Sequence, residues 1–118
     1  MSIVHIVAPA GLDAAGFVKG NPPAAIGQSP VPVLTTCAAY AAEDGSIKTG
    51  TWEASPGQFA RAVVDAEFSH FIAGHATFVT EGGSRFEFRA GDAAYFPPNT
   101  RGIWTIHQTL RKTYCVWR

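Results

Sequence analysis

Few side chains in this sequence have the types and spacing that catalysis requires. The two cysteines, Cys37 and Cys115, do not form a Cys-x-x-Cys pair, so neither a zinc knuckle nor a thiol redox motif is indicated. There is no Gly-x-Ser-x-Gly motif and no glycine-rich phosphate loop, which argues against the corresponding hydrolases and nucleotide binders. A lone histidine is more often packed or solvated than catalytic. The histidines here are His5, His70, His75 and His107.

One acidic residue stands in a regular frame of glycines and a proline. Six residues separate Glu67 from Gly74, and five separate Gly91 from Pro97. This frame resembles the two motifs that define cupins, in which a His-x-His pair, a glutamate and a third histidine hold a divalent metal inside a β-barrel.

The resemblance extends over residues 50–118 and is specific, because several spaced elements agree in order. It is to the small single-domain cupins grouped with the ureidoglycine aminohydrolase and ethanolamine-utilisation cupins, many of which have no established activity. The resemblance implies an all-β fold, the cupin double-stranded β-helix or jelly-roll barrel. The elements that carry it are Trp52, Ser55-Pro56-Gly57, Ala66-Glu67, Gly91-Asp92, Phe96-Pro97-Pro98, Thr100-Arg101-Gly102, Trp104 and Arg111-Lys112-x-Tyr114.

Most metal ligands of the cupin motifs are replaced. The three histidine positions fall on Arg61, Val63 and Gly102, which leaves Glu67 as the remaining ligand. A guanidinium group offers donors only, and the other two residues offer no side-chain lone pair. Since one carboxylate is a poor transition-metal site, we expect no tightly held metal in the usual cupin position and no other cofactor.

Glu67 then needs another partner if it points into the barrel, as the resemblance implies. A lone buried carboxylate is costly. Arg61, at a former ligand position, or Lys112, on the last strand, could neutralise it. Two interpretations stay open: a pocket that holds an acid and a base near a substrate, or an ion pair that fills the space of the metal.

Trp104 lies two residues beyond Gly102, so strand alternation puts both on the inward face. Because Gly102 leaves room beside it, the Trp104 ring could form a wall for a planar or sugar-like ligand, or it could simply fill the barrel. Alternation also places His70 and His107 outside. The candidate ligand-binding residues are Arg61, Glu67, Trp104 and Lys112, with Glu67 the best catalytic candidate.

Short strand-like runs alternate with turn residues from residue 33 onward, which is typical of an all-β sandwich or barrel. Gly82-Gly83 indicates a hairpin. Residues 1–8 resemble a first strand, and glycines and prolines interrupt residues 9–32. We therefore expect an irregular N-terminal arm with a first strand over residues 1–32 and one cupin domain over residues 33–118. The predicted strands are 33–41, 46–54, 58–64, 67–72, 75–80, 85–89, 93–96, 102–107 and 110–117.

Composition limits the partners that the protein can have. The 118 residues are 47% hydrophobic and 15% charged, as in a single globular domain. Zero net charge argues against nucleic-acid binding. The apolar run 3–10 is too short to span a bilayer and lacks a basic leader, so we expect no membrane partner, a cytoplasmic location and reduced thiols. A chain this short also favours a homodimer.

The leading functional hypothesis is a metal-independent cupin that binds a small polar metabolite, whether or not it converts it. Two alternatives stay open. One is a metal-dependent enzyme of nitrogen or sugar metabolism with non-standard ligands. The other is a non-enzymatic module for ligand sensing or interaction.

Overall fold

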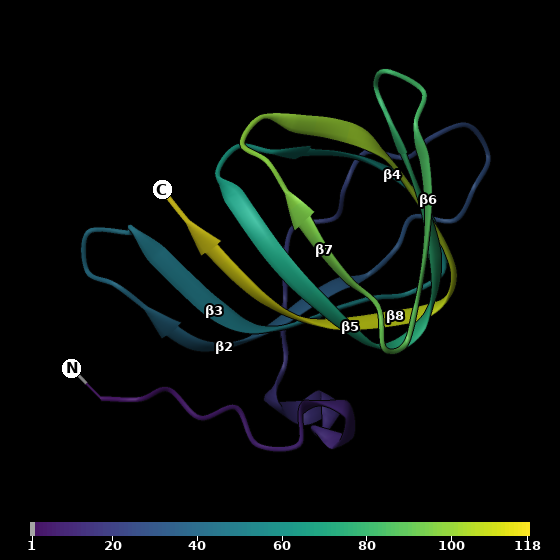
Figure 1. Ribbon diagram of the computed structural model, residues 1–118. Coiled ribbons are helices and arrows are strands. Elements are labelled where there is room, and N and C mark those ends of the chain that lie inside the picture. The colour runs from purple at the N-terminus through teal and green to yellow at the C-terminus, as the bar shows by residue number, and fades with distance from the viewer. Residues whose placement is uncertain (1) are drawn as a thin grey trace.

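The computed structural model describes residues 2–118, and most of them lie in β-strands (Figure 1). Two single-turn 3-10 helices, η1 (Pro9–Gly11) and η2 (Ala14–Gly16), precede the main strands. Nothing helical in this part of the chain is long and apolar enough to cross a membrane. The prediction of an all-β fold is confirmed. The strands are β1 (Val18–Lys19), β2 (Leu34–Ala41), β3 (Ile47–Ala54), β4 (Gly57–Val63), β5 (Ala66–Thr80), β6 (Arg85–Arg89), β7 (Ala93–Phe96) and β8 (Thr100–Trp117).

Two long strands, β5 and β8, each run through both layers of a barrel (Figure 1). The first half of β5 and the second half of β8 belong to the large sheet, whose strand order is β1, β2, β3, β8, β5 and β7. Their other halves belong to the small sheet, whose order is β4, β8, β5 and β6. The inner faces of the two sheets enclose the core.

Bulges bend the two long strands where they pass from one sheet to the other. The ladder between β5 and β8 changes register three times between residues 71 and 76. Gly74, in the middle, has a φ of +94°, which favours glycine. A Cβ atom there would overlap the carbonyl group of Thr109. The close approach of the two backbones therefore requires glycine at this position.

The predicted strands 67–72 and 75–80 leave a break at residues 73–74, and this break is wrong, because the ladder continues through the bulges. The predicted runs on either side of it form one strand, β5, and the last two predicted runs form β8. The other predicted strands agree with β2, β3, β4, β6 and β7 to within one residue at each end. The hairpin at Gly82-Gly83 joins β5 to β6 as predicted, with a φ of +95° at Gly83.

Arg111 fastens the N-terminal arm to the outer face of the large sheet. Its guanidinium group pairs with Glu53 at 2.7 Å and also donates to three arm carbonyls at 2.9–3.2 Å. These are the carbonyls of Pro9, Ala10 and Leu12.

The first strand expected over residues 1–8 is wrong as far as the structure describes it. Residues 2–8 form no strand, and Met1 lies outside the described residues. The arm does contain one short strand, β1, which pairs with the edge of β2. The apolar side chains of Ile3 and Val7 are 94% and 62% exposed, so this segment has no sheet face on which to bury them.

Packed aromatic side chains fill the middle of the barrel. Each is at most 7% exposed, and the neighbouring ring centroids lie 4.5–6.2 Å apart. The rings come from both sheets, and burial of one such side chain contributes about 1.5–3 kcal/mol. This aromatic cluster consists of Phe71, Phe78, Phe88, Phe96 and Trp104.

Candidate functional site

Glu67 and Lys112 form a buried ion pair inside the barrel. Lys112 Nζ lies 2.5 Å from Glu67 Oε2, and the hydroxyl of Ser69 donates to the same oxygen at 2.7 Å. The side chains of Lys112 and Glu67 are only 8% and 6% exposed. The partner that Glu67 was expected to need is thus Lys112. The ammonium group of Lys112 therefore contacts the carboxylate that would bind the metal in the usual cupin motifs.

The pairing of β5 with β8 fixes the position of these two charges. Glu67 lies opposite Val116, and Phe71 lies opposite Lys112. Side chains two residues apart share one face of a strand, so Glu67, Ser69 and Phe71 all point into the barrel. The ion pair is therefore diagonal across two adjacent strands of the large sheet.

Aromatic rings surround the ammonium group of Lys112. Its Nζ lies 4.7 Å from the ring centroid of Trp52 and 5.7–6.0 Å from those of Phe71, Phe96 and Trp104. The face of an aromatic ring attracts a cation. These rings therefore offset part of the free energy of hydration that the ammonium group loses on burial.

Burial and pairing act in opposite directions on Glu67. Burial alone raises the pKa of its carboxyl group, but the charge and hydrogen bond of Lys112 and the bond from Ser69 together outweigh it. The pKa of Glu67 consequently lies below its ordinary value of 4.5. Burial lowers the pKa of Lys112 below 10.5, and Glu67 opposes that shift only in part.

A polar pocket of about 350 Å³ opens beside the ion pair, between β4 and the large sheet. Three cations and two carboxylates contribute to its lining. Because Glu67 and Lys112 neutralise each other, a positive excess remains, which favours an anionic ligand. The charged lining residues are Lys48, Arg61, Asp65, Glu67 and Lys112.

Arg61 lines the polar pocket without pairing to Glu67. Its side chain is exposed, and within residues 2–118 it forms no ion pair with a carboxylate. Its charge nevertheless helps to lower the pKa of both Glu67 and Lys112. A guanidinium group at the rim of a pocket is suited to bind a ligand carboxylate through two parallel hydrogen bonds.

Trp104 belongs to the aromatic cluster as well as to the pocket wall. It lines the polar pocket but is only 3% exposed. The free space expected beside Gly102 is not there, because a Cβ atom at Gly102 would overlap the ring of Phe78 and the carbonyl oxygen of Val79. Trp52 is half-buried and also lines the pocket, so its ring is the more accessible one.

Two further side chains of the site were missed by the sequence reasoning. Ser69 orients Glu67, and Tyr114 lines the polar pocket. Burial, together with Glu67 and Cys37, raises the pKa of Tyr114, so its hydroxyl group stays protonated and can donate a hydrogen bond. Strand alternation could have found both, because each lies two residues beyond a member of the ion pair.

A larger cleft of about 870 Å³ lies on the other side of the aromatic cluster. Its walls are mainly apolar, and it contains neither member of the buried ion pair. The polar pocket is therefore the candidate site. Aromatic residues that line the larger cleft include Phe78, Phe86, Phe88, Tyr95 and Phe96.

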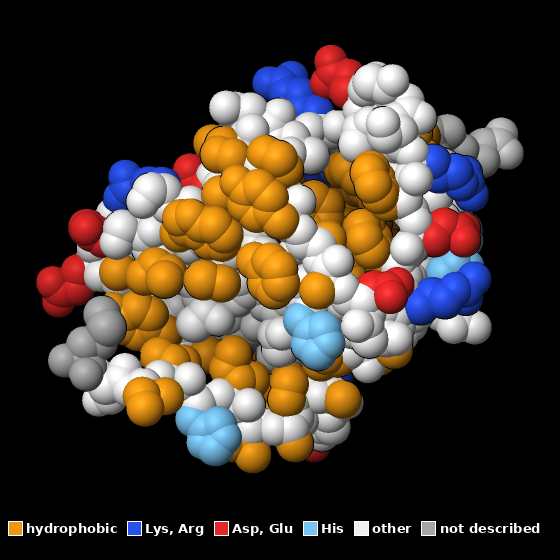
Figure 2. Space-filling model, in the orientation of Figure 1, with side chains coloured by type: hydrophobic (Ala, Val, Ile, Leu, Met, Phe, Trp, Pro, Cys, Tyr) orange, Lys and Arg blue, Asp and Glu red, His pale blue; other side chains and the backbone are white. Residues whose placement is uncertain are grey.

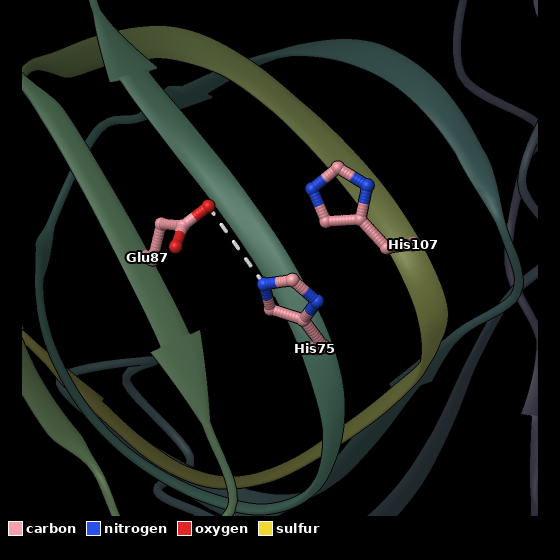
Figure 3. A group of neighbouring side chains, drawn as sticks. All are labelled: His75, Glu87 and His107. Atoms are coloured by element: carbon pink, nitrogen blue, oxygen red, sulfur yellow. Dashed lines mark ion pairs between the residues drawn. The ribbon is translucent and has the colours of Figure 1, made fainter.

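His75 of β5 and His107 of β8 meet on the outer face of the barrel. His70 and His75 both lie on the single strand β5. The rings of His75 and His107 have centroids 4.6 Å apart, and His75 Nε2 lies 3.8 Å from Glu87 Oε1 (Figure 3). Sequence reasoning missed this group, since its members come from three strands.

Comparisons with known proteins agree with this fold. A family model described as the EutQ-like cupin domain matches residues 41–114. Among curated proteins, none matches the chain.

Three solved structures illustrate the likeness of fold, and their alignments with this chain differ in coverage. The EutQ protein of Clostridium difficile is 16% identical, with a TM-score of 0.64 over 73% of this chain and 68% of that one. A DUF861-family protein of unknown function from Pseudomonas syringae is 24% identical, with a TM-score of 0.74 over 85% of this chain and 43% of that one. A cupin superfamily protein from Desulfitobacterium hafniense is 7% identical, with a TM-score of 0.61 over 71% and 76%. At these identities the likeness shows the fold alone, a cupin β-barrel.

Proposed function

Because the chain belongs to the family of EutQ-like cupin domains, we propose that its barrel binds a small polar metabolite without the metal of the usual cupin site. The observation that supports this proposal is the ion pair of Lys112 with Glu67. A metal ion on the Glu67 carboxylate would have to displace the ammonium group and leave it buried without a partner, which is costly.

The lining of the polar pocket indicates the class of ligand. Among the described residues Arg61 forms no ion pair, so its guanidinium group can bind a ligand carboxylate. The ammonium group of Lys112, although paired with Glu67, can donate a hydrogen bond deeper in the barrel. Glu67 would accept a hydrogen bond or a proton, and Trp52 with Trp104 would supply apolar walls. A volume of about 350 Å³ suits a small molecule.

The same pair could also do chemistry. Burial lowers the pKa of the Lys112 ammonium group, so Lys112 is the member of the pair suited to exchange a proton with a bound ligand, as in lyases, isomerases and hydrolases, while Glu67 holds it in place. The resemblance to ureidoglycine aminohydrolase cupins adds ureido compounds to the ligands worth testing. The thiols of Cys37 and Cys115 are free, which fits the cytoplasmic location that we propose.

A thermal-shift screen tests the binding proposal. Tag-free protein is screened in excess EDTA against carboxylates, sugars and ureido compounds. We expect at least one carboxylate-bearing compound to raise the Tm, and Arg61→Gln to lose that rise. Arg85→Gln, an exposed arginine on the outer face of β6, is the matched control and should keep it. Absence of any shift, or a full shift with Arg61→Gln, would overturn the proposal. Turnover assays on the hits then separate an enzyme from a binding protein.

A further inference from the structure

Three potential metal ligands meet on the outer face of the small sheet, on the opposite side of the strands from the barrel interior. They are His75 on β5, Glu87 on β6 and His107 on β8, and one ligand atom from each lies within 4.8 Å of the others (Figure 3). This group shares no residue with the polar pocket. It therefore needs an explanation of its own.

A β-bulge brings the two histidines together. The register passes from His75 opposite Gln108 to Ala76 opposite Ile106, which leaves His107 as the extra residue on β8. Ala76 and Ile106 are 0% and 3% exposed and point inward. Their neighbours His75 and His107 consequently both point outward, and Figure 3 shows the two rings side by side.

One nitrogen in this group lacks a partner. Among the described residues, the buried His75 Nε2 has no hydrogen-bond partner, and Glu87 Oε1 at 3.8 Å is too far away to accept one. The hydroxyl group of Thr77, which is 2% exposed, lies between the other two members, 2.8 Å from His107 Nε2 and 3.3 Å from Glu87 Oε1. Buried polar atoms are rarely left unpaired.

We propose that His75, Glu87 and His107 bind a divalent transition metal, and that Zn²⁺ fits best. Two imidazoles and a carboxylate with one open position form a donor set that zinc accepts. In a tetrahedral site with bonds of about 2.0–2.2 Å, the ligand atoms lie about 3.3–3.6 Å apart. The group therefore needs to contract by roughly 1 Å, which the 46% exposed Glu87 side chain can do without disturbing the core. Thr77 would hold the ligands from outside the coordination sphere.

Two arginines compete with the metal for Glu87. Arg85 lies 3.6 Å and Arg89 4.0 Å from its carboxylate oxygens, and both are more than 60% exposed. Their charges repel a dication, so removal of either should tighten metal binding. A cluster held together only by hydrogen bonds and surface ion pairs would show no such gain.

Zinc titration of tag-free, chelator-stripped protein against a chromogenic competitor tests this proposal. We expect one zinc ion per chain, and His75→Gln, Glu87→Gln and His107→Gln should each weaken binding at least about tenfold. Arg85→Gln should tighten it. His70→Gln and Glu67→Gln are controls for a surface histidine and for the barrel, and both should bind like the parent. Visible absorption of the Co²⁺-loaded protein gives a second readout that is independent of stability.

Two results of these titrations would contradict the proposed metal site on the outer face. No zinc binding by the parent, or parental affinity in the His75→Gln/His107→Gln double variant, would overturn the outer-face site. Loss of zinc binding in Glu67→Gln with retention in Glu87→Gln would place the metal in the barrel. That result would also contradict the metal-independent pocket, whereas failure of the outer site alone leaves the pocket proposal unaffected.

Discussion

Two adjacent cations, Arg111 and Lys112, show how strand alternation separates neighbouring charges. Arg111 points outward, where it pairs with Glu53 and binds the N-terminal arm. Lys112 points inward and pairs with Glu67. In the sequence the two read as a short basic cluster, yet both are at most 9% exposed. Each buried cation is therefore neutralised by its own carboxylate, Glu53 or Glu67. Removal of either carboxylate would leave a buried positive charge without its counter-charge.

Glu67→Gln should destabilise the protein. The amide keeps the shape of the side chain but leaves the buried ammonium group of Lys112 without its counter-charge. We expect the free energy of unfolding in urea to fall by roughly 1–4 kcal/mol. The matched control is Glu43→Gln, an exposed position at which the change should stay within about 0.5 kcal/mol. Equal stability of parent and Glu67→Gln would mean that the pair is not a structural contact.

Low pH should remove the contribution of the Glu67–Lys112 ion pair to the free energy of unfolding of the parent protein. The pKa of Glu67 lies below 4.5 in the folded protein and returns to about 4.5 in the unfolded chain. Between these two pKa values the unfolded chain binds more protons than the folded protein. The contribution is complete above about pH 4.5 and is lost as the pH falls through the folded-state pKa. The stability difference between the parent and Glu67→Gln, measured in urea at a series of pH values, should therefore narrow below about pH 4.5. A difference that stays constant down to about pH 3 would contradict this.

At the scale of elements, the bulges at the middle of β5 and β8 create both the barrel and the outer histidine group. Gly74 permits the close approach of β8, and the register shift beside His75 turns His107 toward it. Both effects depend on how two distant strands meet. Neither is visible in the local spacing of residues.

Gly74→Ala and Gly82→Ala make the same chemical change in two different settings. At Gly74 the φ of +94° and the Thr109 carbonyl both oppose a methyl group, and we expect a loss of more than about 1 kcal/mol in the free energy of unfolding. At Gly82 nothing lies within 4 Å of the added Cβ atom, so the change should be small. Thermal or urea unfolding of the two variants compares them directly. Equal effects would show that the bulge does not require glycine.

The sequence could predict where strands lie in this fold but not that neighbouring predicted runs join into the single long strands β5 and β8. A glycine after an alternating run reads as a turn at both Gly74 and Gly82-Gly83, and only the second forms one. The spaced frame located Glu67, and alternation could have extended the site to Ser69 and Tyr114. The outer histidine group could not be predicted, because three strands and a bulge bring its members together.

At the scale of the whole molecule, hydrophobic side chains remain exposed on the outer face of the large sheet. Figure 2 shows them gathered over β5, β7 and β8. Phe68, Tyr95 and Trp117 are 48%, 54% and 38% exposed, and the last two rings stack with centroids 6.0 Å apart. A contiguous apolar patch of this kind favours association. We propose that this face packs against a second copy of the chain, and that Ile3 to Val7 of the arm lie on or near that partner.

Light scattering at micromolar concentration should give twice the chain mass of 12.5 kDa. Phe68→Arg should shift the protein toward the monomer, because it places a charge in the patch. Ile103→Arg is the matched control, since Ile103 is also exposed, at 40%, but lies in the small-sheet half of β8, opposite Ala60 and Val79. A monodisperse parent of 12.5 kDa would count against the dimer.

Calorimetric titration of the best carboxylate hit from the screen tests most directly whether the polar pocket works without a metal. The titration is run on tag-free protein in excess EDTA and again with added Zn²⁺. If Lys112 has taken the place of the metal, the affinity should be the same in both, and Arg61→Gln should weaken it at least about tenfold, as expected for loss of a charged hydrogen-bonded contact. Binding that disappears in EDTA and returns with Zn²⁺ would contradict a metal-independent pocket.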